Sequence, residues 1–431
     1  MGIAKAQNLV APALVLLVLA VIGAVYLSDR ALYAAIMVHW GDYPDGPPFA
    51  DLRSVLTQLE CHRAGIAVIE AARAFDDCGV YNYSPLLLGL PVRIDPASSD
   101  ALGLVLCCVF AASLVFLPVR RAPRDVVFMA LAVLSGAVMW ALASANVDLI
   151  MFELALAVSA LACLRGRARF AAYAVALLAG LVKYYPVVLM GHALSESRRA
   201  FLWPFAIGVA VAALFVAVFH GQLAASMEVL PAGSVLRGRW GAQILPLGIQ
   251  WLAGGARPED MANTAYPLVA FVALFAAAIA AVIWLARRPA MARALPSLPD
   301  WPRALLISGA LIVVGCFAAW QNLPFRGIFL LLALPGLLML TAEPGEAGPL
   351  RNLPALVLLL MWQGPLSQGV LHLMVAAGLP EAASVLVQLT IWLVTQAIWW
   401  WVVVLLAAIL HAGLVLPFVR RFAGQGEGRG T

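Results

Sequence analysis

Long apolar runs alternate with short polar segments along almost the whole chain, and the polar segments carry most of the charged residues. A helix needs about 20 apolar residues to cross about 30 Å of hydrocarbon, so runs of this kind predict transmembrane helices. The runs lie near residues 9–27, 100–118, 126–144, 147–164, 170–193, 201–219, 264–286, 303–320, 327–341, 350–376 and 384–417. The pattern predicts an all-α polytopic membrane protein.

One run, 170–193, is interrupted in its middle by Lys183, Tyr184, Tyr185 and Pro186. Proline breaks the helical hydrogen-bond ladder, and a lysine is costly inside lipid. We therefore expect this run to form two half-crossings that turn near the outer surface. The predicted bundle then has about 12 crossings.

The basic residues test this topology, because Lys and Arg are enriched in cytoplasmic loops. With the split at Lys183, all basic clusters lie on the same side as both chain termini; without it, the alternation fails after Arg199. The clusters are Arg120, Arg121 and Arg124; Arg165, Arg167 and Arg169; Arg198 and Arg199; Arg287, Arg288 and Arg293; and Arg420 and Arg421. Both termini are therefore predicted to be cytoplasmic. The predicted outer segments are 28–99, 144–148, the turn at Lys183, 220–263 and 320–326.

The first apolar run follows the short start MGIAKAQ, as the core of a secretory signal would. The run is longer than an ordinary signal core and lacks a convincing small-residue cleavage site, so we expect a retained first span. The glycine-rich tail, 424–431, is expected to be disordered.

Composition agrees with a membrane location. Hydrophobic residues make up 64% of the 431 residues and charged residues 11%, and the mean hydropathy is +0.96, which no water-soluble domain could match. The net charge of +5 lies in orientation clusters, so nucleic-acid binding is not expected. The sequence has no Walker or dinucleotide motif and no HxxxH or CxxC spacing, so we expect neither a cofactor nor a metal.

Two of the six cysteines lie in the polar segment after the first span. Cys61 and Cys78 could form a disulfide if that segment lies in an oxidising compartment, and two free thiols are the alternative. The other four cysteines fall in apolar runs and are expected to act as small packing residues.

An amphipathic stretch, DLRSVLTQLECHRAG, begins at Asp51. Its leucines and Val55 recur at helical spacing, which predicts an interfacial helix on the membrane surface. Asp51 could cap this helix, or it could be a general base that removes a proton from an acceptor hydroxyl. Rival acids, for which a solvated loop position is the commoner case, are Asp42, Asp45, Asp76 and Asp77.

Residues at the ends of two apolar runs are candidates for substrate binding. Tyr81 and Tyr83 could belong to the interfacial aromatic belt or could stack on a sugar. Asn146 and Asp148 could cap the helix expected at 147–164. Glu153 lies deeper in that run, where an ionisable residue usually faces the bundle interior and indicates a functional site.

Several basic residues lie on the predicted outer side, against the usual inward bias. Lys183 occupies the proline-broken turn, Arg237 and Arg239 lie in VLRGRWGAQ, and Arg326 lies in WQNLPFRG. Each alone could pair with an acid of the Asp51 loop, but together they favour binding of a phosphate group. The neighbouring candidates for substrate binding are Tyr185, Gln321 and Asn322.

The chain resembles glycosyltransferase family 87 of the GT-C superfamily, whose members are mannosyltransferases that use polyprenyl-phosphate-mannose. The most specific stretch is NVDLIMFELALAVSALACLRGRARFAAYAVALLAGLVKYYPVVLM, where the polar residues fall in the order of the family signature. The stretch FRGIFLLLALPGLL is similar to the family's arginine-containing span, although Phe325 stands where relatives often have tyrosine. The loop that begins at Asp51 corresponds in position to the loop with the family's catalytic aspartate.

This resemblance implies a GT-C-like catalytic module over 1–341 with a periplasmic loop at 28–99, followed by C-terminal spans and a short cytoplasmic tail over 342–431. The implied reaction is an inverting, metal-independent transfer of a mannose-like sugar from a polyprenyl-phosphate donor to a lipid or glycan hydroxyl, at the periplasmic face of a bacterial inner membrane. Asp51 would be the base. The residues near the donor phosphate would be Lys183, Arg237, Arg239 and Arg326.

Three other functions compete with this one. A non-enzymatic scaffold would leave so many outward polar residues at membrane depth unexplained. A secondary transporter or flippase would also bury charged residues and broken helices, but such folds usually show matching interruptions in two halves. The chain has one interrupted run without a counterpart. An outer-leaflet oligosaccharide polymerase or ligase normally carries its large outer loop late in the chain, whereas the large predicted outer loop of this chain follows the first span.

Overall fold

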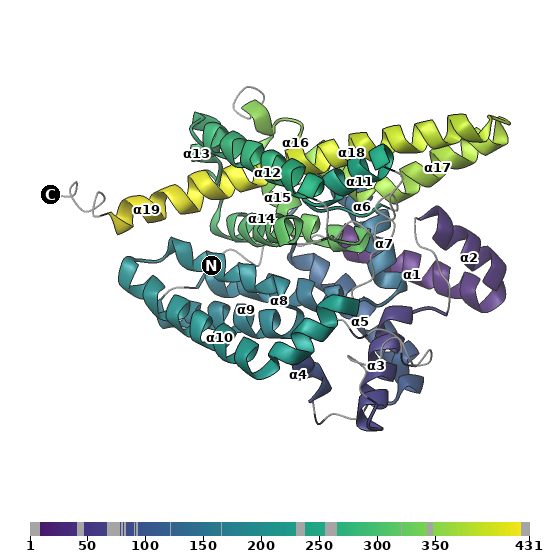
Figure 1. The fold of residues 1–431 in the computed structure, drawn as a ribbon, viewed down its shortest axis with the longest axis horizontal. Helices are drawn as coiled ribbons and strands as arrows, with labels where there is room; N and C mark the ends of the chain where they lie inside the picture. Colours follow the sequence, from purple (N-terminus) through teal and green to yellow (C-terminus); the bar gives the residue numbers. More distant parts are fainter. Residues whose placement is uncertain are drawn as a thin grey trace. The chain divides into compact units, whose positions relative to one another are not determined.

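The structure is a computed structural model, and it describes residues 9–40, 47–66, 78, 81, 83–89, 91, 94–120, 122–164, 166–229, 238–254, 265–319, 321–342 and 348–423. Within these residues the regular elements are helices, and the one β pairing is an isolated bridge between Trp240 and Asn322. The predicted all-α class is therefore confirmed for this part of the chain (Figure 1).

The chain forms two compact units that interleave along the sequence. Unit 1 contains Met1–Asp45, Ala111–Ala141 and Ala232–Leu416, and unit 2 contains Gly46–Phe110, Leu142–Pro231 and Pro417–Thr431. The domain boundary expected near residue 341 does not coincide with this division, because unit 1 runs through that position without interruption.

Unit 2 is a group of helices around α8 and α9. Its elements are α3 (Ala50–Arg63), α4 (Pro85–Leu88), η2 (Pro96–Ser98), most of α5 (Ser99–Ser113), α8 (Asp148–Ala162), η4 (Gly166–Arg169), α9 (Phe170–Lys183), η5 (Tyr185–Ser195), α10 (Arg198–Val229) and nearly all of α19 (Leu416–Phe422). Helices α8 and α9 pack side by side, and α10 contacts α9 (Figure 1). The helix that we expected to begin at Asp51 is α3.

Unit 1 contains α14 and α15, two helices that pack against each other and in which most residues are buried. Its elements are α1 (Val10–Ser28), α2 (Arg30–His39), η3 (Leu114–Phe116), α6 (Pro123–Val133), most of α7 (Gly136–Ala143), α11 (Ile244–Gly254), α12 (Ala265–Ala286), α13 (Pro289–Ala294), α14 (Asp300–Ala319), η7 (Pro324–Phe329), α15 (Leu330–Leu340), η8 (Gly348–Leu350), α16 (Leu353–Met361), α17 (Gln363–Ala376), α18 (Glu381–Leu410) and the π-helical η9 (His411–Val415). A Cβ atom at Gly309 would lie 2.7 Å from the backbone nitrogen of Ala333, so glycine is what allows α14 and α15 to approach so closely.

Every apolar run predicted from the sequence has a helical counterpart. In the described residues, six helices are long and apolar enough to cross a membrane, and up to eight spans result if each of two bent helix pairs counts as one. The bends are 40° between α6 and α7 and 64° at the junction of α16 and α17. The chain is thus a plausible multi-pass membrane protein, whereas the number of about 12 crossings stays a prediction.

Two segments differ in detail from the expectation. The predicted loop at 220–263 is partly helical, because α10 continues to Val229 and α11 begins at Ile244. The run at 170–193 is broken where expected, between α9 and η5. A Cβ atom at Gly180 would lie 2.7 Å from Cβ of Val187, whereas residues seven apart in a continuous helix are separated by about 10 Å. The chain therefore folds back at this break.

A disulfide joins Cys61, near the end of α3, to Cys78, with the two Cα atoms 6.1 Å apart. Cys78, Tyr81 and Leu88 form a small buried cluster beside it. The hydroxyl of Tyr81 donates a hydrogen bond to the carbonyl oxygen of Ser84 at 2.7 Å, and burial raises the pKa of this tyrosine. The disulfide thus ties α3 to the segment that leads to Tyr83.

We expect the double substitution Cys61→Ser and Cys78→Ser to lower the free energy of unfolding by about 3 kcal/mol, the chain-entropy value for a closed loop of about 15 residues. Chemical denaturation of the detergent-solubilised protein measures this loss. As a control on the bond itself, alkylation of unreduced, unfolded protein should modify the four free cysteines, and alkylation of six would contradict the disulfide.

Candidate functional site

Five polar side chains meet in unit 2, and we call them the Asn146 cluster: Asp51, Asn146, Asp148, Lys183 and Tyr185. Asn146 is its centre, in the turn between α7 and α8. Its Nδ2 donates to Oδ2 of Asp51 at 2.6 Å. Its Oδ1 accepts from Nζ of Lys183 at 3.2 Å and from the backbone N–H of Asp148 at 2.9 Å. Residues from three separate parts of the sequence therefore share one hydrogen-bond network.

Lys183 and Asp148 form a buried ion pair inside this cluster. Nζ of the lysine lies 2.5 Å from Oδ1 of the aspartate, and the exposed fractions of the two side chains are 9% and 0%. The hydroxyl of Tyr185 donates to the same Oδ1 at 2.6 Å. The ring of Tyr83 lies 5.1 Å from the ammonium group, within range of a cation–π contact. The lysine charge is therefore neutralised by a carboxylate of the chain itself.

Local sequence places both charges at favourable helix ends. Lys183 is the last residue of α9, where the helix dipole is negative, and Asp148 is the first residue of α8, where the dipole is positive. Pro186 follows shortly after the break and prevents α9 from continuing. The pair therefore joins the end of one helix to the beginning of its neighbour.

Strained backbone surrounds the same cluster. The described chain contains three non-glycine residues with positive φ: Phe49 at 62°, Ala145 at 45° and Tyr184 at 54°. Each lies within two residues of a member of the Asn146 cluster. Such conformations cost on the order of 1–3 kcal/mol each and concentrate at functional sites. This coincidence marks the cluster as the leading candidate site in unit 2.

The start of α3 is fixed on the turn that carries Asn146. The backbone N–H of Phe49 donates to the carbonyl oxygen of Ala143 at 2.7 Å, and that of Leu52 donates to Ser144 at 3.3 Å. The ring of Phe49 packs where a side chain on Gly103 of α5 would stand. Backbone contacts and packing together therefore set the position of Asp51.

Asp51 does not cap α3. The N-cap residue is Phe49, and Asp51 lies in the first turn with its carboxylate directed to Asn146 instead of to a backbone N–H. In the described chain its Oδ1 makes no hydrogen bond, and the side chain is half-buried. One carboxylate oxygen is thus held in place while the other is open to a ligand.

The remaining candidates of unit 2 have different surroundings. Tyr81 is fully buried beside the disulfide, and its possible stacking on a sugar stays a prediction. Tyr83 is half-buried over Lys183. Glu153 is half-buried on α8, about one turn beyond the cluster.

Unit 1 holds a second set of polar residues, which we call the Arg326 cluster: Arg239, Gln321, Asn322 and Arg326. Nη1 of Arg326 donates to Oδ1 of Asn322 at 2.6 Å. Nη1 of Arg239 donates to Oε1 of Gln321 at 2.9 Å. Paired backbone bonds between Trp240 and Asn322, of 3.0 and 2.7 Å, join the two segments. The bridge therefore joins the segment of Arg239 to the segment that leads into η7 and Arg326.

Glutamines in the apolar spans support the Arg326 cluster, and the sequence analysis missed them. Nε2 of Gln363 donates to the carbonyl oxygen of Gly238 at 3.0 Å, and Nε2 of Gln396 donates to that of Arg239 at 2.9 Å. Trp240 stacks on Trp399 with ring centroids 4.1 Å apart. The signal was present, because a buried amide within a transmembrane run needs a partner.

Several residues named from the sequence lie outside the described residues. They are Arg237 among the expected phosphate ligands and Asp42, Asp45, Asp76 and Asp77 among the rival acids. Where the structure describes the chain, no group of three or more His, Cys, Asp and Glu residues could hold a metal ion.

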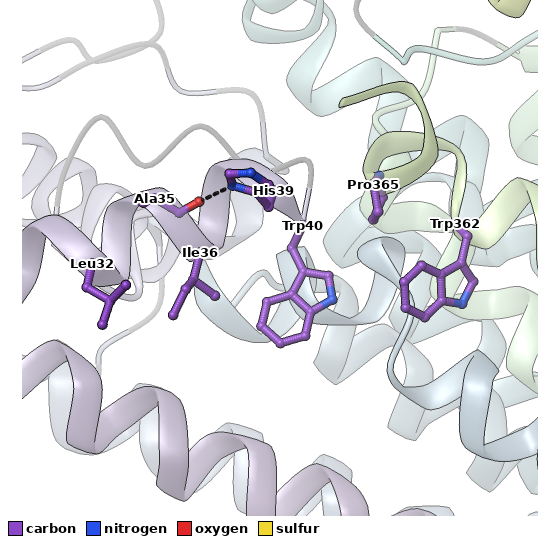
Figure 2. Close-up of a pocket in the computed structure, with 7 residues that line it drawn as sticks. All are labelled: Leu32, Ala35, Ile36, His39, Trp40, Trp362 and Pro365. Atoms are coloured by element: carbon purple, nitrogen blue, oxygen red, sulfur yellow. Dashed lines mark hydrogen bonds between the residues drawn. The ribbon is translucent and has the colours of Figure 1, made fainter. Parts of the chain in front are cut away.

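A pocket of about 400 Å³ lies in unit 1 between α2 and the start of α17 (Figure 2). The indole N–H of Trp40 donates to the carbonyl oxygen of Leu134, just after α6, and that of Trp362 donates to the carbonyl oxygen of Leu131, on α6. Nδ1 of His39 lies 2.7 Å from the carbonyl oxygen of Ala35. The pocket is lined by Leu32, Ala35, Ile36, His39, Trp40, Trp362 and Pro365, and it contains no carboxylate.

No family model, no curated protein and no solved structure matches this chain. The two clusters are therefore interpreted from their own geometry.

We expect Lys183→Met to lower the free energy of unfolding by about 3–5 kcal/mol, because it leaves the carboxylate of Asp148 buried without its cation. The double substitution Lys183→Met with Asp148→Asn should be more stable than Lys183→Met alone. Thermal unfolding in detergent compares the three proteins. If Lys183→Met melted like the wild type, the lysine would not have the structural role that the ion pair implies.

Proposed function

We propose that this chain is a membrane glycosyltransferase that moves a mannose-like sugar from a polyprenyl-phosphate donor to a hydroxyl of a lipid or glycan acceptor. The observation that carries the proposal is the state of Asp51, with one carboxylate oxygen bound by Asn146 and the other open. A general base needs such a fixed carboxylate within reach of the proton that it removes. The resemblance to glycosyltransferase family 87, most specific around Asn146 and Lys183, supports the same chemistry.

In the proposed reaction, Asp51 takes the proton of the acceptor hydroxyl while that oxygen forms a bond to the anomeric carbon of the sugar. The bond from this carbon to the phosphate oxygen breaks, and polyprenyl phosphate leaves with the bonding electrons. Attack opposite to the leaving group inverts the configuration. The negative charge that develops on the phosphate needs cations or hydrogen-bond donors for its stabilisation.

For the phosphate we propose Arg239 and Arg326, each of which the structure places among amide partners. Guanidinium groups suit phosphate because they bind it through two parallel hydrogen bonds. Lys183 was a phosphate candidate from the sequence, but its ammonium group is already paired with Asp148. We therefore propose that Lys183 supports Asn146 and Asp148 instead of contacting the donor.

The buried ion pair also favours one alternative, a transporter or flippase for an anionic or lipid-linked substrate. Ionisable residues inside membrane proteins commonly mark transport pathways. Vesicles with purified protein that move a lipid-linked sugar, without forming any glycosylated product, would favour this alternative. No contact in the described residues singles out an oligosaccharide polymerase or ligase.

We expect Asp51→Asn to lower turnover by about 10²- to 10⁴-fold, the usual contribution of a general base. The assay combines purified protein, polyprenyl-phosphate-mannose and candidate lipid acceptors, with detection of the glycosylated product. The matched control is Asp100→Asn, an exposed acid that pairs with Arg53 and should keep full activity. Equal turnover of wild type and Asp51→Asn would remove Asp51 as the base.

We expect Arg326→Gln to raise KM for the polyprenyl-phosphate donor by about 10- to 100-fold, since a charged hydrogen bond contributes about 1.5–3 kcal/mol. Arg303→Gln, which removes a guanidinium group from a pair with Asp300 near the start of α14, is the control and should leave KM unchanged. A donor titration that gave the same KM for Arg326→Gln and wild type would exclude Arg326 from the phosphate site.

A further inference from the structure

We infer that Asn146 is the positioning residue for the base: it holds the Asp51 carboxylate with Oδ2 occupied and Oδ1 presented to the acceptor hydroxyl. This inference rests on the proposed function, because it assigns a role within that reaction. Its starting point is the 2.6 Å hydrogen bond between Nδ2 of Asn146 and Oδ2 of Asp51, two residues that are 95 positions apart.

The amide of Asn146 has one permitted orientation. Its Oδ1 faces two donors, the ammonium group of Lys183 and the backbone N–H of Asp148. A flipped amide would turn its NH₂ group toward both donors and its oxygen toward the carboxylate of Asp51. The flip would therefore break all three hydrogen bonds of the Asn146 side chain. The neighbours of Asn146 therefore force it to donate to Asp51.

Because this donor is fixed, the two carboxylate oxygens of Asp51 have different roles. Oδ2 accepts from Asn146, and no other hydrogen bond to this carboxylate occurs in the described residues. Oδ1 is thus the oxygen available to take a proton from a hydroxyl. Rotation of the carboxylate about its own bond, which would misplace Oδ1, is opposed by the bond to Asn146.

Asn146 is itself held from several sides. It is 2% exposed, and the residue before it, Ala145, is fully buried with a positive φ. The ion pair of Lys183 with Asp148 fixes the two donors that orient the amide. This arrangement gives the buried charge pair and the strained turn a common role, because both hold the asparagine that contacts Asp51.

The substitution Asn146→Asp isolates this role. It keeps an oxygen for Lys183 and for the N–H of Asp148, but it replaces the donor toward Asp51 by a second carboxylate oxygen. The charged or titratable groups around the new carboxylate are Asp51 from α3, Asp148 from α8, Lys183 from α9, Tyr185 from η5 and Tyr83 beside the lysine. Two adjacent carboxylates resist double ionisation and share a proton as the pH falls.

We expect Asn146→Asp to lower kcat by about 100-fold at neutral pH, with KM for the donor changed by no more than about twofold, because removal of one oriented donor has an effect of this size. As the pH falls, the shared proton restores a donor between the two carboxylates. The activity of the variant should then rise over a range in which wild-type activity falls. A purely structural role would lower activity at every pH without changing the shape of the profile.

The matched control is Asn352→Asp, an exposed asparagine before α16 whose side chain makes no cap hydrogen bond. It should keep the wild-type rate and pH profile. If Asp51→Asn is inactive while Asn146→Asp keeps the wild-type rate and profile, the inference is overturned and the proposed function stands.

A second measurement needs no substrate. Melting temperatures of Asp51→Ala, Asn146→Ala and the double variant form a double-mutant cycle. We expect the double variant to lose less than the sum of the two single losses. Additive losses would show that the two side chains do not interact, and would overturn the inference even if no lipid-linked sugar is ever a substrate.

Discussion

The buried ion pair between Asp148 and Lys183 is the interaction on which the candidate site depends. Either charge alone would be strongly destabilising when buried to this degree, so the two helix ends that carry them must stay together. Their favourable positions on the helix dipoles reduce the cost, and the hydroxyl of Tyr185 satisfies the aspartate further. Because the pair also orients the amide of Asn146, it acts on Asp51 through one intermediate residue.

Strained backbone conformations lie next to the buried charges of the Asn146 cluster. Phe49, Ala145 and Tyr184 adopt backbone conformations that glycine would adopt more easily, and all three adjoin members of the Asn146 cluster. Such strain persists only where the surrounding contacts over-determine the conformation. Here those contacts are the hydrogen bonds from the start of α3 to the turn before α8 and the fold-back of η5 on α9. The strain lowers the stability of this region, and the same contacts hold the carboxylate of Asp51 in place.

The Arg326 cluster of unit 1 is built differently. Its guanidinium groups are oriented by neutral amides, Asn322 and Gln321, and its backbone is held by two glutamines from the apolar spans. Guanidinium groups held in this way suit phosphate, because they bind it through two parallel hydrogen bonds. The ammonium group of Lys183 forms a buried ion pair with Asp148. The proposal therefore assigns the donor phosphate to the arginines and a supporting role to the lysine.

The sequence by itself determined the helices, because a run of apolar residues long enough to cross a bilayer has few other ways to satisfy its backbone. It also located the break after Lys183, since proline and a charge act locally, and it identified α3 from its spacing. It left open whether Cys61 pairs with Cys78, and it could not identify the partner of Lys183, for which a phosphate was expected. Only the tertiary structure decided those points and the contact of Asp51 with Asn146. The physical reason is that hydrogen bonds and ion pairs act over a few ångströms, and which distant residues come within that range depends on how the helices pack.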